Sequence, residues 1–359
     1  MRAGPSDMSE QSETIAVVGA SPFAWLLAGL LASDHSRAVV LVGPAPQPFA
    51  LRPLPSLSVA PLTRPQSWAL LHDATREAIR RLSRIAPRMG ERVDLALFAG
   101  SPTSRIALGH IRRMAEGFGH PVEPIDRAEQ SGIGLRDTWL FDTALFMAAA
   151  PRWLASANVT VTHTPEALVM NRDGTATFAD TLITRVILAD DWAILGHLSA
   201  DEIAAFARVE PWVGIETPPH RPLPFRAGLD LDSGTVFSQS AQGTFSGAAP
   251  DDDGKGIARI AACLAQDPAP RLAARTHFKR LVSHDGAPVI GPTRRGQMFV
   301  IAGLGPLDLV LAPTLAAIVC RTASPSGAEW ATAHGAALRQ PRRPVAEFSP
   351  AALLYGGTA

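Results

Sequence analysis

The sequence predicts an α/β fold in which one domain is built from discontinuous segments and a second, α+β domain has a mainly antiparallel sheet. Three observations support this prediction. A strand, a turn and a helix follow one another over residues 14–33, and an apolar strand at 38–42 completes a βαβ unit. A second strand, turn and helix occupy residues 297–320. Between these two units the chain is rich in short strand patterns separated by Pro and Gly.

The composition is typical of a packed globular protein. The chain has 359 residues, of which 47% are hydrophobic and 18% are charged, so it is long enough for about two domains. Lys plus Arg and Asp plus Glu each number 33, and this balance does not indicate a nucleic-acid partner. Cys263 and Cys320 follow neither metal nor redox spacing. We therefore expect two buried thiols in a reducing compartment and no metal site.

The first residues and the apolar segment 15–32 bear on localisation. Residues 1–13 are polar and lack the hydrophobic stretch of a secretory signal. Gly19, Ser21 and Pro22 interrupt the apolar segment, which therefore favours strand, turn and helix over a membrane span. We expect a cytoplasmic protein with no membrane span.

Other local patterns complete the expected organisation. Residues 66–84 have apolar side chains at helical spacing, and their arginines lie mostly on the opposite, solvated face. Residues 140–156 predict a second apolar helix, and Asp173-Gly174 predicts the turn of a hairpin over 167–180. The expected first domain comprises 13–60, 140–200 and 284–330, the expected second domain 61–139 and 201–283, and the expected C-terminal extension 331–359.

The turn after the first strand is similar to the glycine-rich turn that binds dinucleotides. Gly19 stands at the first glycine of the G-x-G-x-x-G pattern, whereas Ser21 and Ala24 replace the second and third. Ser21 and Pro22 suit the start of a helix, whose free N–H groups bind phosphate. The second strand ends in Gly43, where this type of site has an acidic residue for the ribose.

The most specific motif lies near the C-terminus. Residues 283–320, SHDGAPVIGPTRRGQMFVIAGLGPLDLVLAPTLAAIVC, resemble the closing segment of the D-amino-acid oxidase superfamily, flavoproteins that include glycine oxidase and sarcosine oxidase. The family pattern is Asp-Gly-x-Pro-x-Ile-Gly-Pro, then a strand, a glycine-rich turn and a helix. The matching residues here are Asp285, Gly286, Pro288, Ile290, Gly291, Pro292, Gly303, Gly305, Leu311, Ala312 and Pro313.

The resemblance implies a Rossmann-like domain that binds FAD. The glycine-rich turn would let backbone N–H groups approach the flavin ring. Trp192 matches a Trp in another family turn, but Asp190 and Asp191 replace small residues there, and their charges would repel a pyrophosphate unless they point away. The expected cofactor-binding residues are Gly19, Ala20, Ser21, Phe23, Ala24, Val42, Gly43, Ala167, Ala189, Trp192, Gly303, Leu304, Gly305, Pro306 and Leu307.

The same resemblance suggests a substrate site. The candidate catalytic residues are Arg280 and His284. Arg280 stands where glycine-oxidase-like members bind the substrate carboxylate, and His284 lies nearby. An arginine suits this role because its planar fork makes two charge-assisted hydrogen bonds to a carboxylate. Tyr355 is the only tyrosine, so the active-site tyrosines of some D-amino-acid oxidases are missing.

Three functions remain open from the sequence. The first is an FAD-dependent oxidoreductase that oxidises the C–N bond of an amino acid or related amine by hydride transfer. The second is a catalytically weak or inactive subunit or partner with a flavoprotein fold. A partner subunit and a homo-oligomer are both left open. The third is a flavin monooxygenase that modifies a partner protein, although Gly303-Leu304 is not the Gly-Asp pair typical of that group. A simple NAD dehydrogenase would leave residues 283–320 unexplained.

Overall fold

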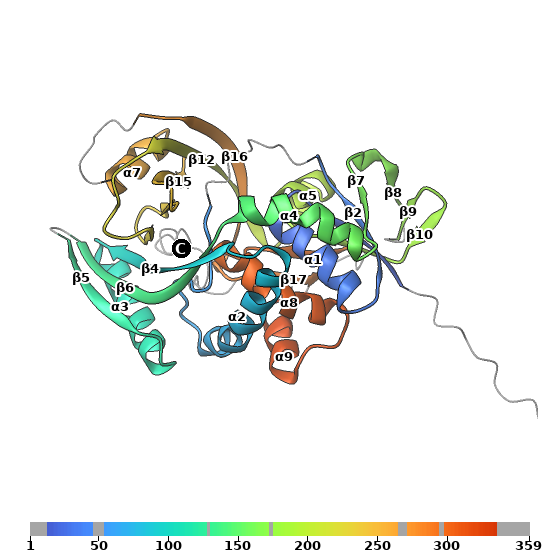
Figure 1. Cartoon of the computed structure of the whole chain (residues 1–359), viewed down its shortest axis with the longest axis horizontal. Helices are drawn as coiled ribbons and strands as arrows, with labels where there is room; N and C mark the ends of the chain where they lie inside the picture. Colours follow the sequence, from blue (N-terminus) through green and yellow to red (C-terminus); the bar gives the residue numbers. More distant parts are fainter. Residues whose placement is uncertain are drawn as a thin grey trace, which may run out of the picture.

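Two sheets occupy the two halves of the molecule, with helices packed between and around them (Figure 1). The computed structural model describes residues 13–45, 54–127, 130–171, 175–264, 271–293 and 298–335.

The first sheet has six strands in the order β17-β18-β11-β1-β2-β7. Its central strand β1 pairs in parallel with β2 and β11, and β17 joins the edge in antiparallel orientation. Helices cover the sheet, so the central strands are apolar on both sides. The bounds are β1 (Thr14–Val18), β2 (Ala38–Val42), β7 (Thr160–Thr162), β11 (Arg185–Leu188), β17 (Val289–Pro292) and β18 (Phe299–Ala302).

Helix α1 (Pro22–Ser33) is buried along nearly its whole length. The Ser21 hydroxyl accepts a hydrogen bond from the N–H of Ala24 and begins the helix. The helix is apolar all round because it lies against β1 and β2 and contacts α4 (Thr143–Ser156) and α8 (Asp308–Val319).

The second sheet has nine strands, eight of them in the order β16-β12-β15-β14-β13-β4-β6-β3, with β5 paired to β6. All but one of its pairings are antiparallel; β13 runs parallel to β4. The bounds are β3 (Ser56–Leu57), β4 (Gly90–Ala99), β5 (Val122–Arg127), β6 (Gln130–Phe141), β12 (Ala207–Pro219), β13 (Ala227–Asp230), β14 (Val236–Gln239), β15 (Thr244–Pro250) and β16 (Ala274–Ser283).

The remaining elements lie around the two sheets. A three-stranded antiparallel sheet, β10-β9-β8, projects from the six-stranded half (Figure 1). The other bounds are α2 (Pro65–Ile85), α3 (Pro102–Gly117), α5 (Asp191–His197), α6 (Ala200–Ala204), α7 (Gly256–Cys263), α9 (Pro325–Ala333), β8 (Leu168–Met170), β9 (Ala176–Phe178), β10 (Thr181–Ile183) and the 3-10 turns η1 (Pro165–Ala167) and η2 (Gly305–Leu307).

The α/β fold class predicted from the sequence is confirmed, with one sheet mainly parallel and the other mainly antiparallel. The helix expected from residue 140 begins at Thr143 instead, because residues 140–141 end β6 and Asp142 caps the helix. The expected hairpin turn at Asp173-Gly174 lies outside the described residues, as do residues 336–359 of the expected extension. The domain boundaries stay a prediction.

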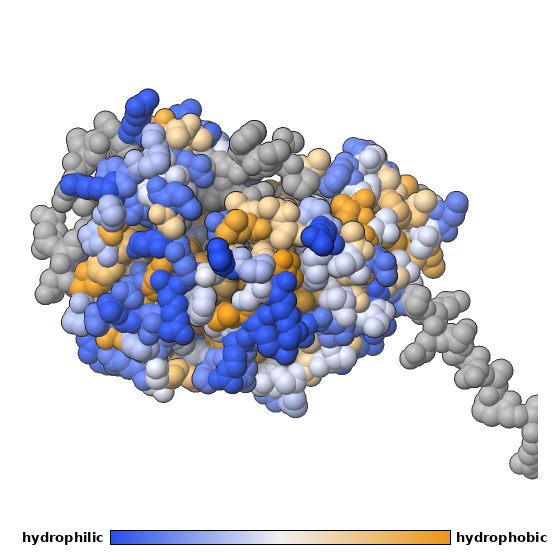
Figure 2. Space-filling view, viewed as in Figure 1, coloured by the Kyte–Doolittle hydropathy of each residue, from blue (hydrophilic) through white to orange (hydrophobic). Residues whose placement is uncertain are grey.

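The surface differs between elements. Hydrophilic residues gather over α2 (Figure 2), where Arg80 and Arg81 pair with Glu77. On the projecting three-stranded sheet, Val169 and Leu182 are 59% and 56% exposed. Within the described residues, no helix combines the length and hydrophobicity that a membrane crossing requires.

Candidate functional site

A cavity of about 530 Å³ opens at the carboxyl ends of β1, β11 and β18, beside strand β16. In open α/β sheets, ligands bind at this end of the strands. Of the predicted site residues, those that line the cavity are Ala20, Ser21, Phe23, Ala189, Trp192, Arg280, Gly303, Leu304 and Gly305. Those outside its lining are Gly19, Ala24, Val42, Gly43, Ala167, Pro306, Leu307 and His284.

The Asp190 carboxylate occupies the N–H groups of the glycine-rich turn. Its Oδ2 accepts hydrogen bonds from the backbone N–H groups of Ala20 and Ser21, at 2.6 and 2.7 Å. Its Oδ1 accepts another from the N–H of Ala193 at 2.9 Å and caps α5. One carboxylate therefore bridges the N-terminal ends of α1 and α5, where the positive ends of two helix dipoles favour an anion.

Gly43 lies against the backbone of the same turn. A Cβ at Gly43 would stand 2.3 Å from the carbonyl oxygen of Gly19. The N–H of Gly19 donates to the carbonyl of Val42, which holds the turn against the end of β2. An acidic side chain at this position would require the backbone to move. The close packing of this turn therefore explains why glycine stands where the ribose-binding acid is expected.

The turn between β18 and α8 uses glycine where the backbone requires it. Gly303 and Gly305 have φ angles of +70° and +57°, in the left-handed region that L-residues disfavour. A Cβ at Gly303 would lie 3.3 Å from the carbonyl oxygen of Ala287. The glycine pattern of this segment thus follows from its turn geometry and from its packing against Ala287, just before β17.

Arg280 is held among aromatic and acidic groups. Its guanidinium carbon lies 4.6 Å from the ring centroid of Trp212 on the neighbouring strand. The carboxylates of Asp191, Glu210 and Asp308 act on it electrostatically and favour its charge, although burial lowers the pKa of its guanidinium. Arg280 therefore has internal counter-ions in the structure.

Two carboxyl groups of the cavity have pKa values well above the ordinary range. Burial raises the pKa of Asp191 to about 6, against the opposing effects of the Arg280 charge and a hydrogen bond from the N–H of Leu281. Burial also raises the pKa of Asp308 to about 6, although the Ser56 hydroxyl donates to its Oδ1 at 2.5 Å. Both groups are costly to charge in the folded state.

The cavity therefore does not fit an FAD bound in the dinucleotide manner. Among the described residues that line it, three carry carboxyl groups, Asp190, Asp191 and Asp308, and two carry basic groups, Lys279 and Arg280. A pyrophosphate would meet the Asp190 carboxylate at the N–H donors that it needs, and like charges at that distance repel strongly. The two aspartates that replace small residues in the sequence motif thus point into the site.

Two other predicted residues lie apart from this cavity. The His284 ring nitrogen Nε2 lies 2.9 Å from the carbonyl oxygen of Ala204, the last residue of α6. Ala167 ends the 3-10 turn η1 before the projecting sheet. Neither contributes to the cavity wall.

The sequence did not predict the roles of Asp308, Glu210 and Trp212. Asp308 follows the glycine-rich turn by three residues and could have been suspected as an acid at a helix start. Glu210 and Trp212 lie on β12, which brings them beside Arg280 only through the pairing with β16. No local sequence signal indicates that pairing.

Comparisons with known proteins agree on the fold. No family model and no curated protein matches the sequence. Among solved structures, L-proline dehydrogenase from P. horikoshii has a TM-score of 0.67 and 13% identity, over 91% of this chain and 97% of the other. Glycine oxidase from Geobacillus kaustophilus has a TM-score of 0.63 and 16% identity, over 87% and 96%. L-amino acid deaminase from Proteus vulgaris has a TM-score of 0.64 and 11% identity, over 90% and 97%.

These three proteins act on amino acids by their names, and the alignments span nearly their whole length. The structural likeness agrees with the resemblance that residues 283–320 carry in the sequence. The chain thus has the fold of the amino-acid oxidases, dehydrogenases and deaminases, as its likeness to the D-amino-acid oxidase superfamily predicted.

Proposed function

We propose that this chain is a binding protein or subunit built on the amino-acid oxidase fold, which does not hold FAD in the dinucleotide manner. The observation that carries the proposal is the Asp190 carboxylate on the N–H groups of Ala20 and Ser21. A chain that supplies its own anion to this turn has the donors of Ala20 and Ser21 already engaged where a pyrophosphate would need them.

A second turn of the same chain supports a structural role for Asp190. At the start of α3, the Asp232 carboxylate accepts hydrogen bonds from the N–H groups of Gly100 and Ser101, at 2.5 and 3.2 Å. Both helices begin with Ser-Pro after a strand, and both serines cap their helix. The turn at α3 is not part of the cavity. A carboxylate that accepts hydrogen bonds from two backbone N–H groups there joins a strand, a helix and a distant segment.

The fold itself favours a second candidate function, an FAD-dependent oxidoreductase that acts on an amino acid or related amine. Its support is the likeness to L-proline dehydrogenase and glycine oxidase. This function requires the Asp190 side chain to leave the N–H donors of Ala20 and Ser21 when FAD binds. Each of these donors makes a hydrogen bond to a charged carboxylate, and a bond of this kind stabilises the folded protein by about 1.5–3 kcal/mol.

An absorbance spectrum of the purified protein tests the proposal. We expect no flavin bands, and no quenching of flavin fluorescence when FAD is added. Copurification with stoichiometric FAD, followed by bleaching on anaerobic addition of an amino acid, would establish the oxidoreductase instead.

Two substitutions test whether the Asp190 carboxylate is what prevents FAD from binding. Asp190→Gly frees the N–H donors, and we expect FAD to bind this variant at least about tenfold more tightly than the wild type, a change of about 1.4 kcal/mol. Asp232→Gly is the matched control, since it removes a carboxylate with the same kind of contacts at a turn outside the cavity. An equal gain in both variants would show that loosened structure, and not a freed phosphate site, causes the effect.

A further inference from the structure

We propose that a second cavity, between the β14–β15 hairpin, strand β12 and the start of α4, binds a small protonated amine with Glu216 as its counter-ion. The cavity has a volume of about 400 Å³, within the range of small-molecule sites. Among the residues that line the two cavities, only Leu54 is shared. The inference therefore does not depend on whether FAD binds the first.

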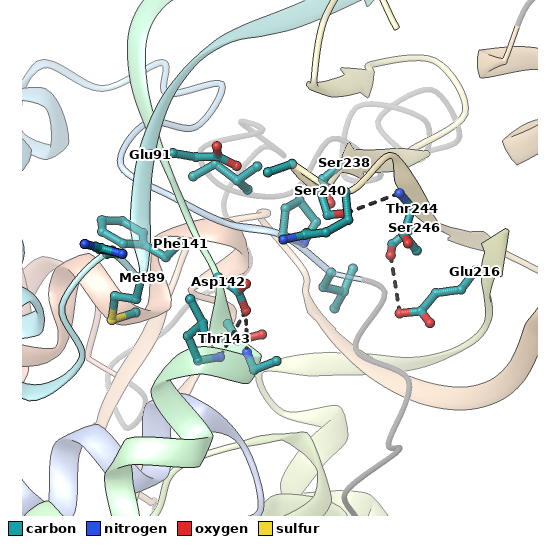
Figure 3. A pocket seen from close by; sticks show the side chains of 18 residues that line it. Met89, Glu91, Phe141, Asp142, Thr143, Glu216, Ser238, Ser240, Thr244 and Ser246 are labelled. Atoms are coloured by element: carbon teal, nitrogen blue, oxygen red, sulfur yellow. Dashed lines mark hydrogen bonds between the residues drawn. The ribbon is translucent and has the colours of Figure 1, made fainter. Parts of the chain in front are cut away.

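One wall of the cavity is a row of polar side chains on the sheet. Glu216 on β12 is in register with Ser246 on β15, which is in register with Ser238 on β14. Residues in register lie on the same face of a sheet, so the three side chains stand side by side. Figure 3 shows them together on one side of the cavity.

The adjacent row of the same face is apolar. Two positions along each strand, Gly214, Ala248 and Val236 are in register with one another. They face the same way as the polar row because side chains alternate with a period of two along a strand. The carboxylate of Glu216 and the hydroxyls of Ser246 and Ser238 thus lie next to the apolar part of this face.

Glu216 has unused hydrogen-bonding capacity. Its carboxylate is half-buried and, within the described part of the chain, accepts one long hydrogen bond, from the Ser246 hydroxyl at 3.4 Å (Figure 3). Among the residues that the structure describes, no Lys or Arg nitrogen lies within 4.0 Å of it. A carboxylate can accept about four hydrogen bonds, so the single bond from Ser246 leaves Glu216 able to accept donors from a ligand.

The other carboxylates of the cavity are already occupied. Arg226 binds Glu91 in a bidentate pair at 2.7 and 2.5 Å. Asp142 caps α4 and accepts hydrogen bonds from the N–H groups of Ala144 and Leu145 at 2.9 and 3.0 Å. Glu216 is therefore the acid that a ligand can neutralise.

The rest of the wall sets the shape of the ligand. Met89 and Phe141 are buried and lie on the opposite side of the cavity from Glu216 (Figure 3). They offer an apolar surface for the body of a ligand whose ammonium group faces Glu216 and the serine hydroxyls. Arg88, the basic side chain among the described residues of the lining, is exposed, and solvent screens its charge.

Benzylamine is a suitable probe, with benzyl alcohol as its neutral counterpart. Ligand-detected NMR titrations of the flavin-free chain measure both affinities. We expect benzylamine to bind the wild type at least about tenfold more tightly than benzyl alcohol, because only the ammonium pairs with Glu216. Equal affinities for the two probes would overturn the proposal.

Two variants locate the site. Glu216→Gln keeps the shape and removes the charge, and we expect it to abolish the preference for benzylamine. Glu166→Gln, an exposed carboxylate outside the cavity, is the matched control and leaves the preference unchanged. Ser238→Leu narrows the cavity without altering a charge and weakens both probes; a folded Ser238→Leu or Glu216→Gln protein that binds benzylamine as the wild type does would also overturn the proposal.

Discussion

The Arg280 guanidinium stacks over the indole of Trp212, with 4.6 Å between the guanidinium carbon and the ring centroid. Trp212 is 1% exposed and so provides a fixed surface. Its indole N–H lies 3.4 Å from a carboxylate oxygen of Glu210, which pairs in register with Arg280 on the next strand. The arginine is therefore a member of a partly buried charge network as well as a residue of the cavity wall.

Replacing Arg280 tests this network. Arg280→Ala leaves Asp191 and Asp308 without their nearby positive charge, and we expect a loss of about 1–3 kcal/mol in the free energy of unfolding at pH 7.5. Urea unfolding measures it. The loss is smaller at pH 5, where the two carboxyl groups are protonated. Arg280→Lys keeps the charge and loses the planar stacking, so it costs less; a loss independent of pH would contradict the network.

The raised pKa of Asp308 gives a second prediction. Because its pKa is about 6 in the folded protein and 3.8 in the unfolded chain, the folded state binds the proton more tightly. Its contribution to stability is present below pH 3.8 and is lost as the pH rises through 6. Asp308→Asn removes this dependence, and we expect it to stabilise the protein at pH 7.5 by at most about 3 kcal/mol.

Melting temperatures of the wild type and Asp308→Asn between pH 4 and 8 measure this difference. The advantage of the variant should grow between pH 4 and 7 and then stay constant. An advantage that is the same at pH 4 and pH 7.5 would contradict the assignment, because it would not arise from titration.

Gly43 gives a third prediction, on packing. In Gly43→Ala the new Cβ stands 2.3 Å from the carbonyl oxygen of Gly19, so the turn must shift, and we expect a loss of about 1–3 kcal/mol. Gly109→Ala in α3 is the matched control, because nothing lies within 4 Å of its Cβ position. That change should stabilise the helix by about 0.5–1 kcal/mol. Thermal unfolding of both variants distinguishes the two effects, and a Gly43→Ala protein as stable as the wild type would refute the close contact.

Asp190 gives a fourth prediction, independent of any ligand. Asp190→Ala removes the acceptor of three backbone N–H groups, on Ala20, Ser21 and Ala193. We expect urea unfolding to show a loss of about 1–3 kcal/mol. Asp190→Asn keeps an acceptor oxygen without the charge and should lose less. If Asp190→Ala unfolds at the wild-type urea concentration, the carboxylate does not stabilise the turn.

The parts of the fold that are local in sequence could be predicted, and those that depend on distant pairing could not. Strand β1, helix α1 and strand β2 match the sequence pattern because burial on all sides makes them continuously apolar. Strand β16 has no such signal: residues 274–280 alternate between half-buried and exposed, and Arg, His and Lys are among them. Residues 274–283 are recognisable as a strand only from their pairing with β12, and that pairing depends on the tertiary structure.

The candidate site divides in the same way. The glycines at 303 and 305 could be predicted because their turn requires positive φ. The presence of Asp190 and Asp191 in place of small residues could also be seen in the sequence. Where their carboxylates point could not, because it depends on how β11 brings them to the start of α1, 170 residues away along the chain.

The tethered carboxylate at the start of α1 has a consequence for behaviour in solution. A bound cofactor stabilises a protein by mass action, so the stability of such a protein varies with the cofactor concentration. Asp190 is part of the chain, so its effective concentration at the turn is fixed by the fold and does not depend on the concentration of any dissolved ligand. Dissolved phosphates and nucleotides must compete with this intramolecular group, so thermal stability should stay constant in crude extract, dialysed protein and buffer with added nucleotide.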